Sequence, residues 1–297
     1  MSPRPRVVAV VLNWCAEEDT AACVRALEAQ QGVRVTTLIV DNASPDGSGE
    51  RLARLFPGSS FLQTEANLGY AGGNARGIAW ALEQGAEYVF VINDDAEADP
   101  GCVATLVGAL EAEPGAAAAA PTIVHAVPRD VVWWAGGRFD PVRALGMHEG
   151  FGRALGELPA HSRPGAAPRD VSSLSGCAML LRAGVVRTLG GFREDFFAYV
   201  EDTELSVRWR SAGWRLLHVP SALAVHRVAW PEPEPAAFRI RLRDRNRRRL
   251  ARLHLRALER LRFSAWFAAS RCVLAASYAL RGDGARLTAI VRGAFER

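Results

Sequence analysis

Short apolar runs alternate with amphipathic segments along the first third of the chain. The apolar runs occupy residues 6–13, 35–40, 60–63 and 89–93, and helical patterns lie between them at residues 18–30, 50–55 and 75–84. Uninterrupted apolar runs of this length are typical of strands buried on both faces. Strands that alternate with helices predict a mostly parallel sheet flanked by helices, so the expected fold class is α/β.

The second part of the chain continues this pattern less regularly. We expect helices at residues 101–113 and 201–212, and strands at residues 116–124, 172–181, 214–219 and 222–226. Residues 128–169 contain many Gly and Pro and are expected to be rich in loops. Pro220 is expected to end a strand, and residues 231–235 (PEPEP) have the composition of a linker. Everything after this linker is expected to be helical.

Polar residues stand at the carboxyl ends of several predicted strands. Asn13 and Asp41 each follow an apolar run, as do residues 93–95 (Asn-Asp-Asp), and residues 67–74 (NLGYAGGN) form an expected glycine-rich loop. Because the carboxyl ends of parallel strands lie along one edge of a sheet, these groups are expected to converge on a single ligand. Taken one at a time, each feature is better explained by a turn or by the lead-in to a helix.

Two adjacent carboxylates end the fourth predicted strand. Burial of Asp94 and Asp95 is costly unless a cation meets them. Mg²⁺ and Mn²⁺ take carboxylate and phosphate oxygens, so we expect a divalent cation beside a phosphate group. In the glycine-rich segment, Gly69, Gly72 and Gly73 would let the backbone approach a ligand closely.

The composition excludes some other phosphate sites. All 36 basic residues of the 297-residue chain are Arg, and without Lys a P-loop of the GxxxxGK[ST] type is excluded. No GxGxxG sequence follows the first strand, which argues against the usual dinucleotide fold. The five cysteines show no CxxC spacing and the start of the chain resembles no signal peptide, so we expect reduced thiols and a cytoplasmic location.

A second acidic group begins the predicted helix at residues 201–212. The helix dipole favours carboxylates in a first turn, which is enough to explain Glu204. Neighbouring helical side chains point about 100° apart, so Glu201 and Asp202 cannot face one reacting atom equally. We expect one of the two to act, and the other to orient it or to bind the acceptor. His226 ends a strand and is either a ligand or a structural histidine.

Four blocks of sequence resemble the family 2 glycosyltransferases, in particular their rhamnosyltransferase-like and galactofuranosyltransferase-like members. The blocks, within a match over residues 6–228, are residues 40–48 (VDNASPDGS), 67–74, 92–95 (INDD), and 175–182 continuing to 190–205. The resemblance implies a GT-A fold and transfer with inversion from a nucleotide-diphosphate sugar, of the dTDP-rhamnose or UDP-hexose type. It also implies a divalent cation, Mg²⁺ or Mn²⁺, and an acceptor that is a glycan or a lipid-linked saccharide.

The resemblance assigns roles to individual positions. Asp202 corresponds to the general base with Glu201 beside it. Asp95 corresponds to a metal ligand, and His226 corresponds to a histidine that completes the metal or diphosphate site. Asn93 stands where the family's DxD motif has Asp, so Asp95 becomes the expected ligand. The donor-binding positions are Leu12, Asn13, Trp14, Asp41, Asn67, Gly69, Gly72, Asn74, Asn93 and Asp94. The half expected to meet the acceptor contains Ser175, Gly176, Trp133 and Trp134, although Trp side chains are as often simply buried.

The same resemblance divides the chain into a donor-binding half (residues 1–95), an acceptor-binding and catalytic half of the same domain (96–230), and a basic helical extension (231–297).

Residues 239–262 hold eleven Arg against Asp244 and Glu259, a local charge of +9 in a chain of net charge +4. Aromatic residues are nearly absent there, so nucleic acid is not expected, and a membrane surface or a solvated helix face remains.

Residues 263–280 are expected to form an amphipathic helix that does not cross a membrane. Arg271 interrupts the apolar run, and its length is marginal for a span. The helix is expected to pack on the catalytic domain, a partner subunit or the bilayer surface, which leaves self-association open.

Two other functions agree less well with the sequence. A sugar-1-phosphate nucleotidyltransferase would need a glycine-rich signature with Lys, which is absent. An inactive glycan-binding or scaffold protein of the same fold is permitted by Asn93, but the intact Glu201-Asp202 pair and His226 argue against it.

Overall fold

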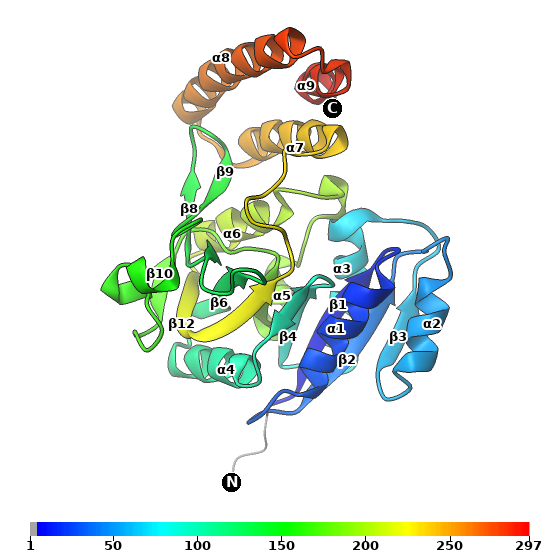
Figure 1. The fold of residues 1–297 in the computed structure, drawn as a ribbon. Helices are drawn as coiled ribbons and strands as arrows, with labels where there is room; N and C mark the ends of the chain where they lie inside the picture. Colours follow the sequence, from blue (N-terminus) through cyan, green and yellow to red (C-terminus); the bar gives the residue numbers. More distant parts are fainter. Residues whose placement is uncertain (1–4, 297) are drawn as a thin grey trace.

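A ten-stranded mixed sheet forms the centre of the computed structural model, which describes residues 5–296 (Figure 1). The strand order is β10 (Arg169–Val171), β12 (Arg215–His226), β6 (Ala116–His125), β11 (Ala178–Arg182), β4 (Tyr88–Asn93), β1 (Val7–Asn13), β2 (Val35–Asp41) and β3 (Ser60–Gln63). Two further strands pair at the side, β5 (Ala96–Ala98) with β12 and β7 (Val132–Trp134) with β6.

The first four strands run parallel, as the alternating pattern predicts. In the register of the sheet, Asn13 lies beside Asp41 and Leu12 lies beside Asn93, so the carboxyl ends share one edge. The intervening helices are α1 (Glu17–Glu28), α2 (Ser48–Leu55) and α3 (Gly69–Glu83). The α/β class and the convergence of these strand ends are therefore confirmed.

The glycine-rich segment at residues 67–74 is not a loop, which corrects the expectation. Helix α3 already begins at Gly69. A Cβ at Gly73 would overlap the side chain of Leu12 on β1, so this glycine allows the helix to pack closely on the sheet. Gly69 has φ +69°, and a Cβ there would meet the carbonyl oxygen of Phe197. Gly69 and Gly73 are therefore required for close packing between elements, and the approach of a ligand to this segment stays a prediction.

Two strand predictions in the second half also need correction. Strand β11 begins only at Ala178, and residues 172–177 are irregular. Strand β12 runs through Pro220 as one strand, with an irregularity in its pairing to β6 between Val219 and Leu223. A proline, which has no N–H group, is tolerated at such a break in the ladder.

The expected loop-rich region at residues 128–169 contains β7, the hairpin of β8 (Gly137–Asp140) and β9 (Leu145–His148), and two short 3₁₀ helices, η1 (Leu155–Glu157) and η2 (Ala160–Ser162). The predicted helices correspond to α4 (Cys102–Ala112) and α6 (Glu201–Ser211). The short helices α5 (Ala183–Leu189) and η3 (Glu194–Phe196) complete this half.

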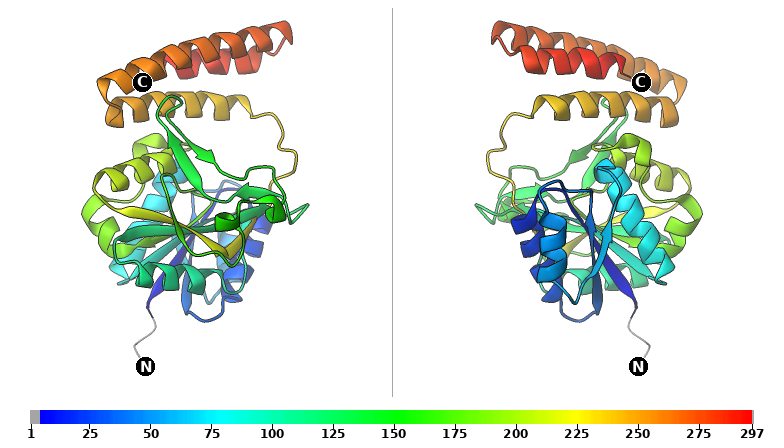
Figure 2. Two further views of the ribbon diagram at one scale, coloured as in Figure 1. Left: turned by 90° about the vertical axis from the view of Figure 1, so that its left-hand side faces the viewer. Right: turned by 90° about the vertical axis from the view of Figure 1, so that its right-hand side faces the viewer.

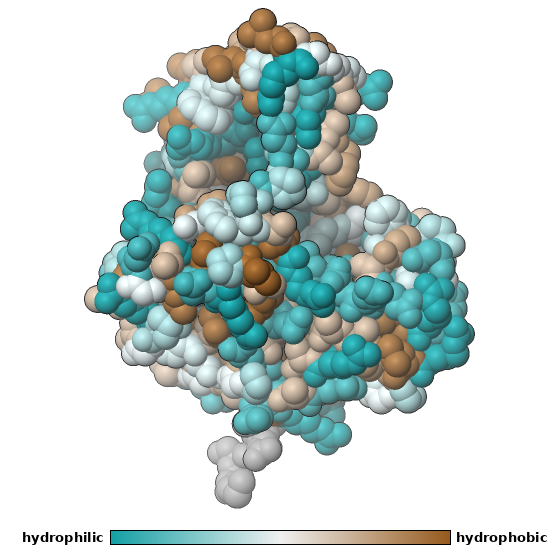
Figure 3. Space-filling view, in the orientation of Figure 1, coloured by the Kyte–Doolittle hydropathy of each residue, from teal (hydrophilic) through white to brown (hydrophobic). Residues whose placement is uncertain are grey.

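The C-terminal extension is helical, as predicted. Helix α7 (Ala237–His254) contacts α6, and α8 (Ala257–Leu280) and α9 (Gly284–Phe295) lie on its other side, away from the sheet (Figures 1 and 2). Helix α8 is long and apolar enough to cross a membrane by length and composition alone, and only 17% of its apolar window is buried. Its exposed apolar side chains include Leu261, Val273 and Leu280, and apolar residues gather at the top of the molecule in Figure 3.

Candidate active site

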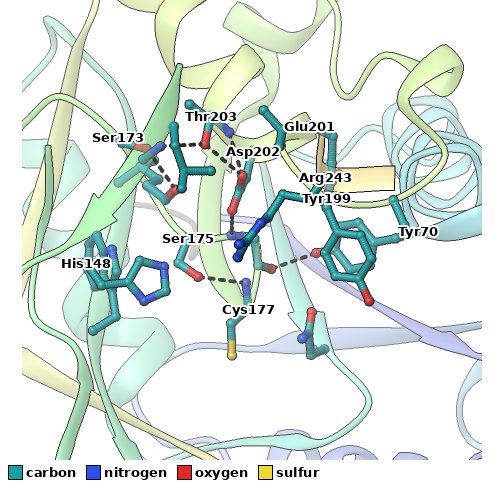
Figure 4. Close-up of a pocket in the computed structure, with 18 of the residues that line it drawn as sticks. Tyr70, His148, Ser173, Ser175, Cys177, Tyr199, Glu201, Asp202, Thr203 and Arg243 are labelled. Atoms are coloured by element: carbon teal, nitrogen blue, oxygen red, sulfur yellow. Dashed lines mark hydrogen bonds between the residues drawn. The ribbon is translucent and has the colours of Figure 1, made fainter. Parts of the chain in front are cut away.

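A cavity of about 350 Å³ lies where β4, β7, β9, the turn before β11, and helices α6 and α7 meet. Its wall contains eight of the predicted site residues: Asn93, Trp133, Trp134, Ser175, Gly176, Glu201, Asp202 and His226. Figure 4 shows Ser175, Glu201 and Asp202 around this cavity. The fold therefore joins residues from positions 93 to 226 in one place.

The backbone that leads into α6 is strained. Positive φ angles occur at three non-glycine residues in a short stretch: Phe197 (62°), Tyr199 (70°) and Val200 (75°). Each such residue costs on the order of 1–3 kcal/mol, so other contacts must hold the segment in place. The buried side chain of Asn246, on α7, donates to the carbonyl oxygens of Phe196 (2.7 Å), Ala198 (2.8 Å) and Tyr199 (2.7 Å). The C-terminal helix thus fixes the approach to Glu201 and Asp202.

The Asp202 carboxylate is held by backbone and hydroxyl donors. Its Oδ2 accepts from the Gly176 N–H at 3.0 Å, and its Oδ1 accepts from the Thr203 N–H at 2.6 Å and from Thr203 Oγ1 at 3.2 Å (Figure 4). The residue lies in the first turn of α6, where the helix dipole favours negative charge. The side chain is half-buried and faces the cavity. This is the arrangement of an oriented carboxylate that a substrate can reach.

Glu201 differs from its neighbour in burial and charge. Its side chain is 5% exposed, and Oε2 has no hydrogen-bond partner among residues 5–296. Burial, together with the negative charge of Asp202, raises the pKa of Glu201 well above its usual value. Burial and the neighbouring charge thus disfavour the ionised form of Glu201, which is the form a general base needs. Of the two roles expected for the second carboxylate, orienting Asp202 would need a hydrogen bond to it, and Glu201 makes none within the described chain. Binding of the acceptor is the other expected role of Glu201.

Asp95 and His226 are brought together from positions 131 residues apart. The Nε2 atom of His226 lies 3.1 Å from Oδ1 of Asp95, because β12 pairs with β5 just after the acidic cluster. Burial alone would raise the pKa of Asp95, but the hydrogen bond and charge of His226 outweigh it and lower the pKa. The His226 ring meets the ring of Trp133 edge-on, with 4.5 Å between their centroids.

The acidic cluster fits a cation that keeps ligands from outside the protein. Burial and the charge of Asp95 raise the pKa of Asp94 to about 7, so a nearby positive charge would relieve it. Buried Oδ1 of Asn93 has no partner within residues 5–296. No group of three or more His, Cys, Asp or Glu in that range could enclose a metal. Mg²⁺ and Mn²⁺ often bind through one or two protein ligands plus phosphate oxygens, and Asp95 with His226 suits that mode.

The edge formed by β1 and β2 is organised by buried polar side chains. Asn13 donates to Oδ1 of Asp41 at 2.7 Å, and to the hydroxyls of Ser44 (3.1 Å) and Ser48 (3.0 Å). Both Asn13 and Asp41 are fully buried. The Asp41 carboxylate is thus occupied by protein donors, and its role in donor binding stays a prediction. Trp14, which is 52% exposed, is the large side chain at this edge that a flat ring could reach.

The glycine-rich block is tied to the same edge. Asn42 donates to Oδ1 of Asn67 and to the carbonyl of Gly69, both at 3.1 Å. Asn74 lies inside α3, donates to the carbonyl of Tyr70 at 3.0 Å, and points its Oδ1 at no partner within residues 5–296. The predicted residues that do not line the cavity are Leu12, Asn13, Trp14, Asp41, Asn67, Gly69, Gly72, Asn74, Asp94 and Asp95. We call residues 12–14, 41 and 67–74 the strand-edge region. They lie around the carboxyl ends of β1 and β2 and, apart from Tyr70, outside the cavity.

Several cavity residues were not predicted. Tyr70 donates its hydroxyl to the Gly176 carbonyl at 2.7 Å, and His148 on β9 packs against Trp133 with 4.5 Å between ring centroids. Arg239 and Arg243 reach the cavity from α7. Their spacing of four residues on a predicted helix was a usable signal, since such residues share a face. The sequence contains no such signal for His148, because the hairpin of β8 and β9 brings this residue to the cavity.

Comparisons with known proteins agree with this geometry. Residues 7–190 match the model of "Glycosyl transferase family 2". The N-acetylglucosaminyl-diphospho-decaprenol L-rhamnosyltransferase of Mycobacterium tuberculosis is 32% identical over 208 residues, which are 66% of this chain and 67% of the relative. The galactofuranosyltransferase GlfT1 of the same organism is 36% identical over 111 residues, which are 35% of this chain and 36% of the relative.

A solved structure supports the fold. The crystal structure of GalNAc-T7 with UDP, GalNAc and Mn²⁺ matches with a TM-score of 0.66 and 14% identity, over 85% of this chain and 48% of that chain. The fold and the family match define a glycosyltransferase of the GT-A type. The chain belongs to glycosyltransferase family 2, and its similarity to rhamnosyltransferases and galactofuranosyltransferases is confirmed.

Proposed function

We propose that this protein is an inverting, metal-dependent glycosyltransferase that moves a sugar from a nucleotide-diphosphate donor to a hydroxyl group of a saccharide. The observation that carries the proposal is the Asp202 carboxylate, which faces the cavity and accepts three hydrogen bonds from Gly176 and Thr203. A fixed carboxylate on the wall of a cavity suits a general base for an acceptor hydroxyl.

The reaction that fits is a single displacement. Asp202 takes the proton of the acceptor hydroxyl while that oxygen attacks the anomeric carbon, and the nucleoside diphosphate leaves from the opposite face, which inverts the configuration. A double displacement would need an ionised carboxylate as nucleophile. Glu201 is a poor candidate, because burial raises its pKa well above the usual value and so disfavours its ionised form.

Asp95 and His226 are the residues that would hold the divalent cation, Mg²⁺ or Mn²⁺. When bound, the cation neutralises charge that builds on the leaving diphosphate. The hydrogen bond between the two side chains keeps the histidine ring oriented toward the carboxylate. The Mn²⁺ in the GalNAc-T7 crystal supports a divalent cation as the cofactor.

The donor is of the dTDP-rhamnose or UDP-hexose type, and the acceptor is a glycan or a lipid-linked saccharide. The name of the mycobacterial rhamnosyltransferase refers to a diphospho-decaprenol saccharide, and the GalNAc-T7 crystal contains UDP. In this proposal the strand-edge region at Leu12 to Trp14, Asp41 and residues 67–74 binds the nucleotide. Ser175, Gly176, Trp133 and Trp134 contact the acceptor.

The protein works in the cytoplasm at the inner face of the cell membrane. The support is α8, whose apolar side chains Leu261, Val273 and Leu280 are exposed, together with the exposed Arg252, Arg256 and Arg260 at the end of α7 and the start of α8. Exposed apolar and basic side chains on adjacent helices suit contact with an anionic bilayer.

The test is transfer from a panel of nucleotide sugars with Mn²⁺ or with a chelator. We expect thermal stabilisation by one nucleoside diphosphate in the presence of Mn²⁺, and a product of inverted anomeric configuration by NMR. If no nucleoside diphosphate shifts the melting temperature, the donor site is wrong, and saccharide binding without donor turnover would identify an inactive binding protein. A product of retained configuration would refute the single displacement.

A further inference from the structure

Two arginines of the C-terminal extension reach the cavity wall without an acidic partner. Arg239 and Arg243 both line the cavity, and neither forms an ion pair with any residue that the structure describes. Figure 4 shows the Arg243 side chain extending into the cavity near Asp202 and Tyr199. Arg239 lies over the Tyr199 ring at 5.3 Å from its centroid. Both side chains therefore present positive charge to whatever occupies the cavity.

The neighbouring arginines show that this is not a general property of the segment. Arg241 and Arg245 pair with Glu296, and Arg249 pairs with Asp195. Asp244, next to Arg243 in the sequence, is taken by Arg247 at 3.3 Å and by Arg271 at 2.7 Å. These ion pairs neutralise much of the positive charge of α7. Arg239 and Arg243 are the arginines of this helix that line the cavity.

One hydrogen-bond donor of Arg243 also has no acceptor in the described part of the chain. Its Nε is buried and makes no hydrogen bond within residues 5–296. Burial and the charge of Arg239 lower the pKa of this guanidinium, partly opposed by Asp244, so an anion beside it would be stabilising. The nearby carboxylate of Asp202 already accepts from Gly176 and Thr203, and not from either arginine. A guanidinium fork with unpaired donors matches the oxygens of a phosphate group.

We propose that Arg239 and Arg243 form a subsite for a phosphate or diphosphate group carried by the acceptor. The inference deepens the proposed glycosyl transfer and rests on it. The position of α7 supports the acceptor as the source, because α7 lies between the cavity and the exposed apolar helix α8 (Figure 2). A lipid-linked saccharide needs this order, with the sugar in the cavity, the diphosphate beside α7 and the lipid along α8. The donor diphosphate is assigned instead to the cation side, at Asp95 and His226.

The experiment measures binding of two probes by calorimetry to the full chain. Inorganic pyrophosphate in a chelator reports on the arginine subsite, and a nucleoside diphosphate with Mn²⁺ reports on the donor site. The variants are Arg243→Gln and Arg239→Gln. Arg252→Gln is the matched control, because Arg252 is an exposed residue of the same helix that does not line the cavity. Neither cavity arginine makes an ion pair in the described chain, so the variants should fold, which circular dichroism checks.

We expect Arg243→Gln to weaken metal-free pyrophosphate binding about 10-fold or more, Arg239→Gln to weaken it less, and Arg252→Gln to leave it within twofold. Nucleoside diphosphate affinity should stay within twofold in all three. Unchanged pyrophosphate binding in Arg243→Gln would overturn the subsite. An equal loss of nucleoside diphosphate affinity would overturn its assignment to the acceptor. A wild-type chain that binds pyrophosphate but no nucleoside diphosphate would refute the proposed donor, and not this subsite.

Discussion

The strand-edge region and the cavity of this protein treat their buried polar groups in opposite ways. At the edge, Asn13 and Asp41 are fully buried and satisfy each other and nearby serine hydroxyls. In the cavity region, Asn93 Oδ1, Glu201 Oε2 and Arg243 Nε have no partner within residues 5–296. A buried unpaired polar group costs about 1–3 kcal/mol, so the cavity carries more of this cost than the edge, where Asn74 Oδ1 alone lacks a partner within residues 5–296. Around Asn13 and Asp41 the edge is a satisfied framework, whereas the cavity leaves several buried groups open to a ligand.

The backbone repeats this contrast. The edge follows regular parallel strands in register, but the segment before α6 holds three non-glycine residues at positive φ. Asn246 on α7 stabilises that segment through three carbonyl groups. The strand-edge region is therefore built by local strand pairing, and the segment before α6 depends on a helix that follows it by more than thirty residues.

The largest expected effect is the loss of transfer activity on substitution of Asp202, which lines the cavity. Asp202→Asn keeps the size of the side chain and removes the base, so we expect kcat to fall about 10²- to 10⁴-fold, with nucleoside diphosphate affinity nearly unchanged. Transfer kinetics measure it. The control is Asp130→Asn, an exposed carboxylate that does not line the cavity. Wild-type turnover in Asp202→Asn would show that another group takes the proton.

Asn13→Ala tests whether the buried polar side chains of the strand-edge region stabilise the fold. The change removes a buried side chain that bonds Asp41, Ser44 and Ser48, and it leaves those groups partly unpaired, so we expect a loss of about 3 kcal/mol in the free energy of unfolding. Urea unfolding measures this loss, and weaker nucleotide binding should accompany it. A stable variant with normal nucleotide affinity would contradict the framework role.

Asn246→Ala tests whether α7 positions the catalytic segment. The carbonyl oxygens of Ala198 and Tyr199 lose their donor and that of Phe196 loses one of several, so we expect a destabilisation of about 2 kcal/mol. A positioning role also predicts a reduced kcat with little change in the KM for donor, measured where both proteins are fully folded. Arg252→Gln on the same helix serves as the control. If kcat is normal in the folded variant, Asn246 contributes to stability alone.

The smallest expected effect concerns acid stability beneath the cavity. Burial lowers the pKa of His218 to about 3, where it contacts Thr122 Oγ1 at 2.9 Å and the edge of the Trp134 ring. Between pH 6.5 and 3 the unfolded chain binds a proton at this histidine and the folded chain does not, so stability falls as the pH is lowered through this range. At pH 5 the loss is about 2 kcal/mol relative to pH 7.5.

The measurement is urea unfolding at both pH values, compared with His218→Gln. The variant should lose less stability on acidification, because its amide does not titrate. An identical loss in both proteins would assign the acid sensitivity to other groups.

Much of the framework was predictable from sequence. The apolar runs at residues 6–13, 35–40 and 89–93 predict parallel strands, and these strands bring Asn13, Asp41 and Asn93 to one edge. The Glu201-Asp202 pair and a difference in role between its members were also predicted, but not the physical cause of that difference. That difference arises from burial, which raises the pKa of Glu201, and from the Gly176 and Thr203 donors that hold Asp202.

Two errors have the same physical origin. The glycine-rich block was expected to be a loop, and it is the start of α3, where Gly73 admits the Leu12 side chain. Pro220 was expected to end a strand, and β12 continues through it at an irregularity in the ladder. Glycine and proline have local preferences, but the packing partner decides how each is used, and that partner is distant in sequence.

The order of strands and the chemistry of their polar ends follow from local composition, because alternation of apolar runs and helices leaves few topologies open. The catalytic arrangement does not follow from it. His226 meets Asp95 through the pairing of β12 with β5, and His148 arrives on a hairpin. Asn246 and Arg243 come from a helix whose sequence indicates only a basic surface. Tertiary structure decides which charges face the cavity, since Glu296, Asp244 and Asp195 pair with other arginines of the same helix.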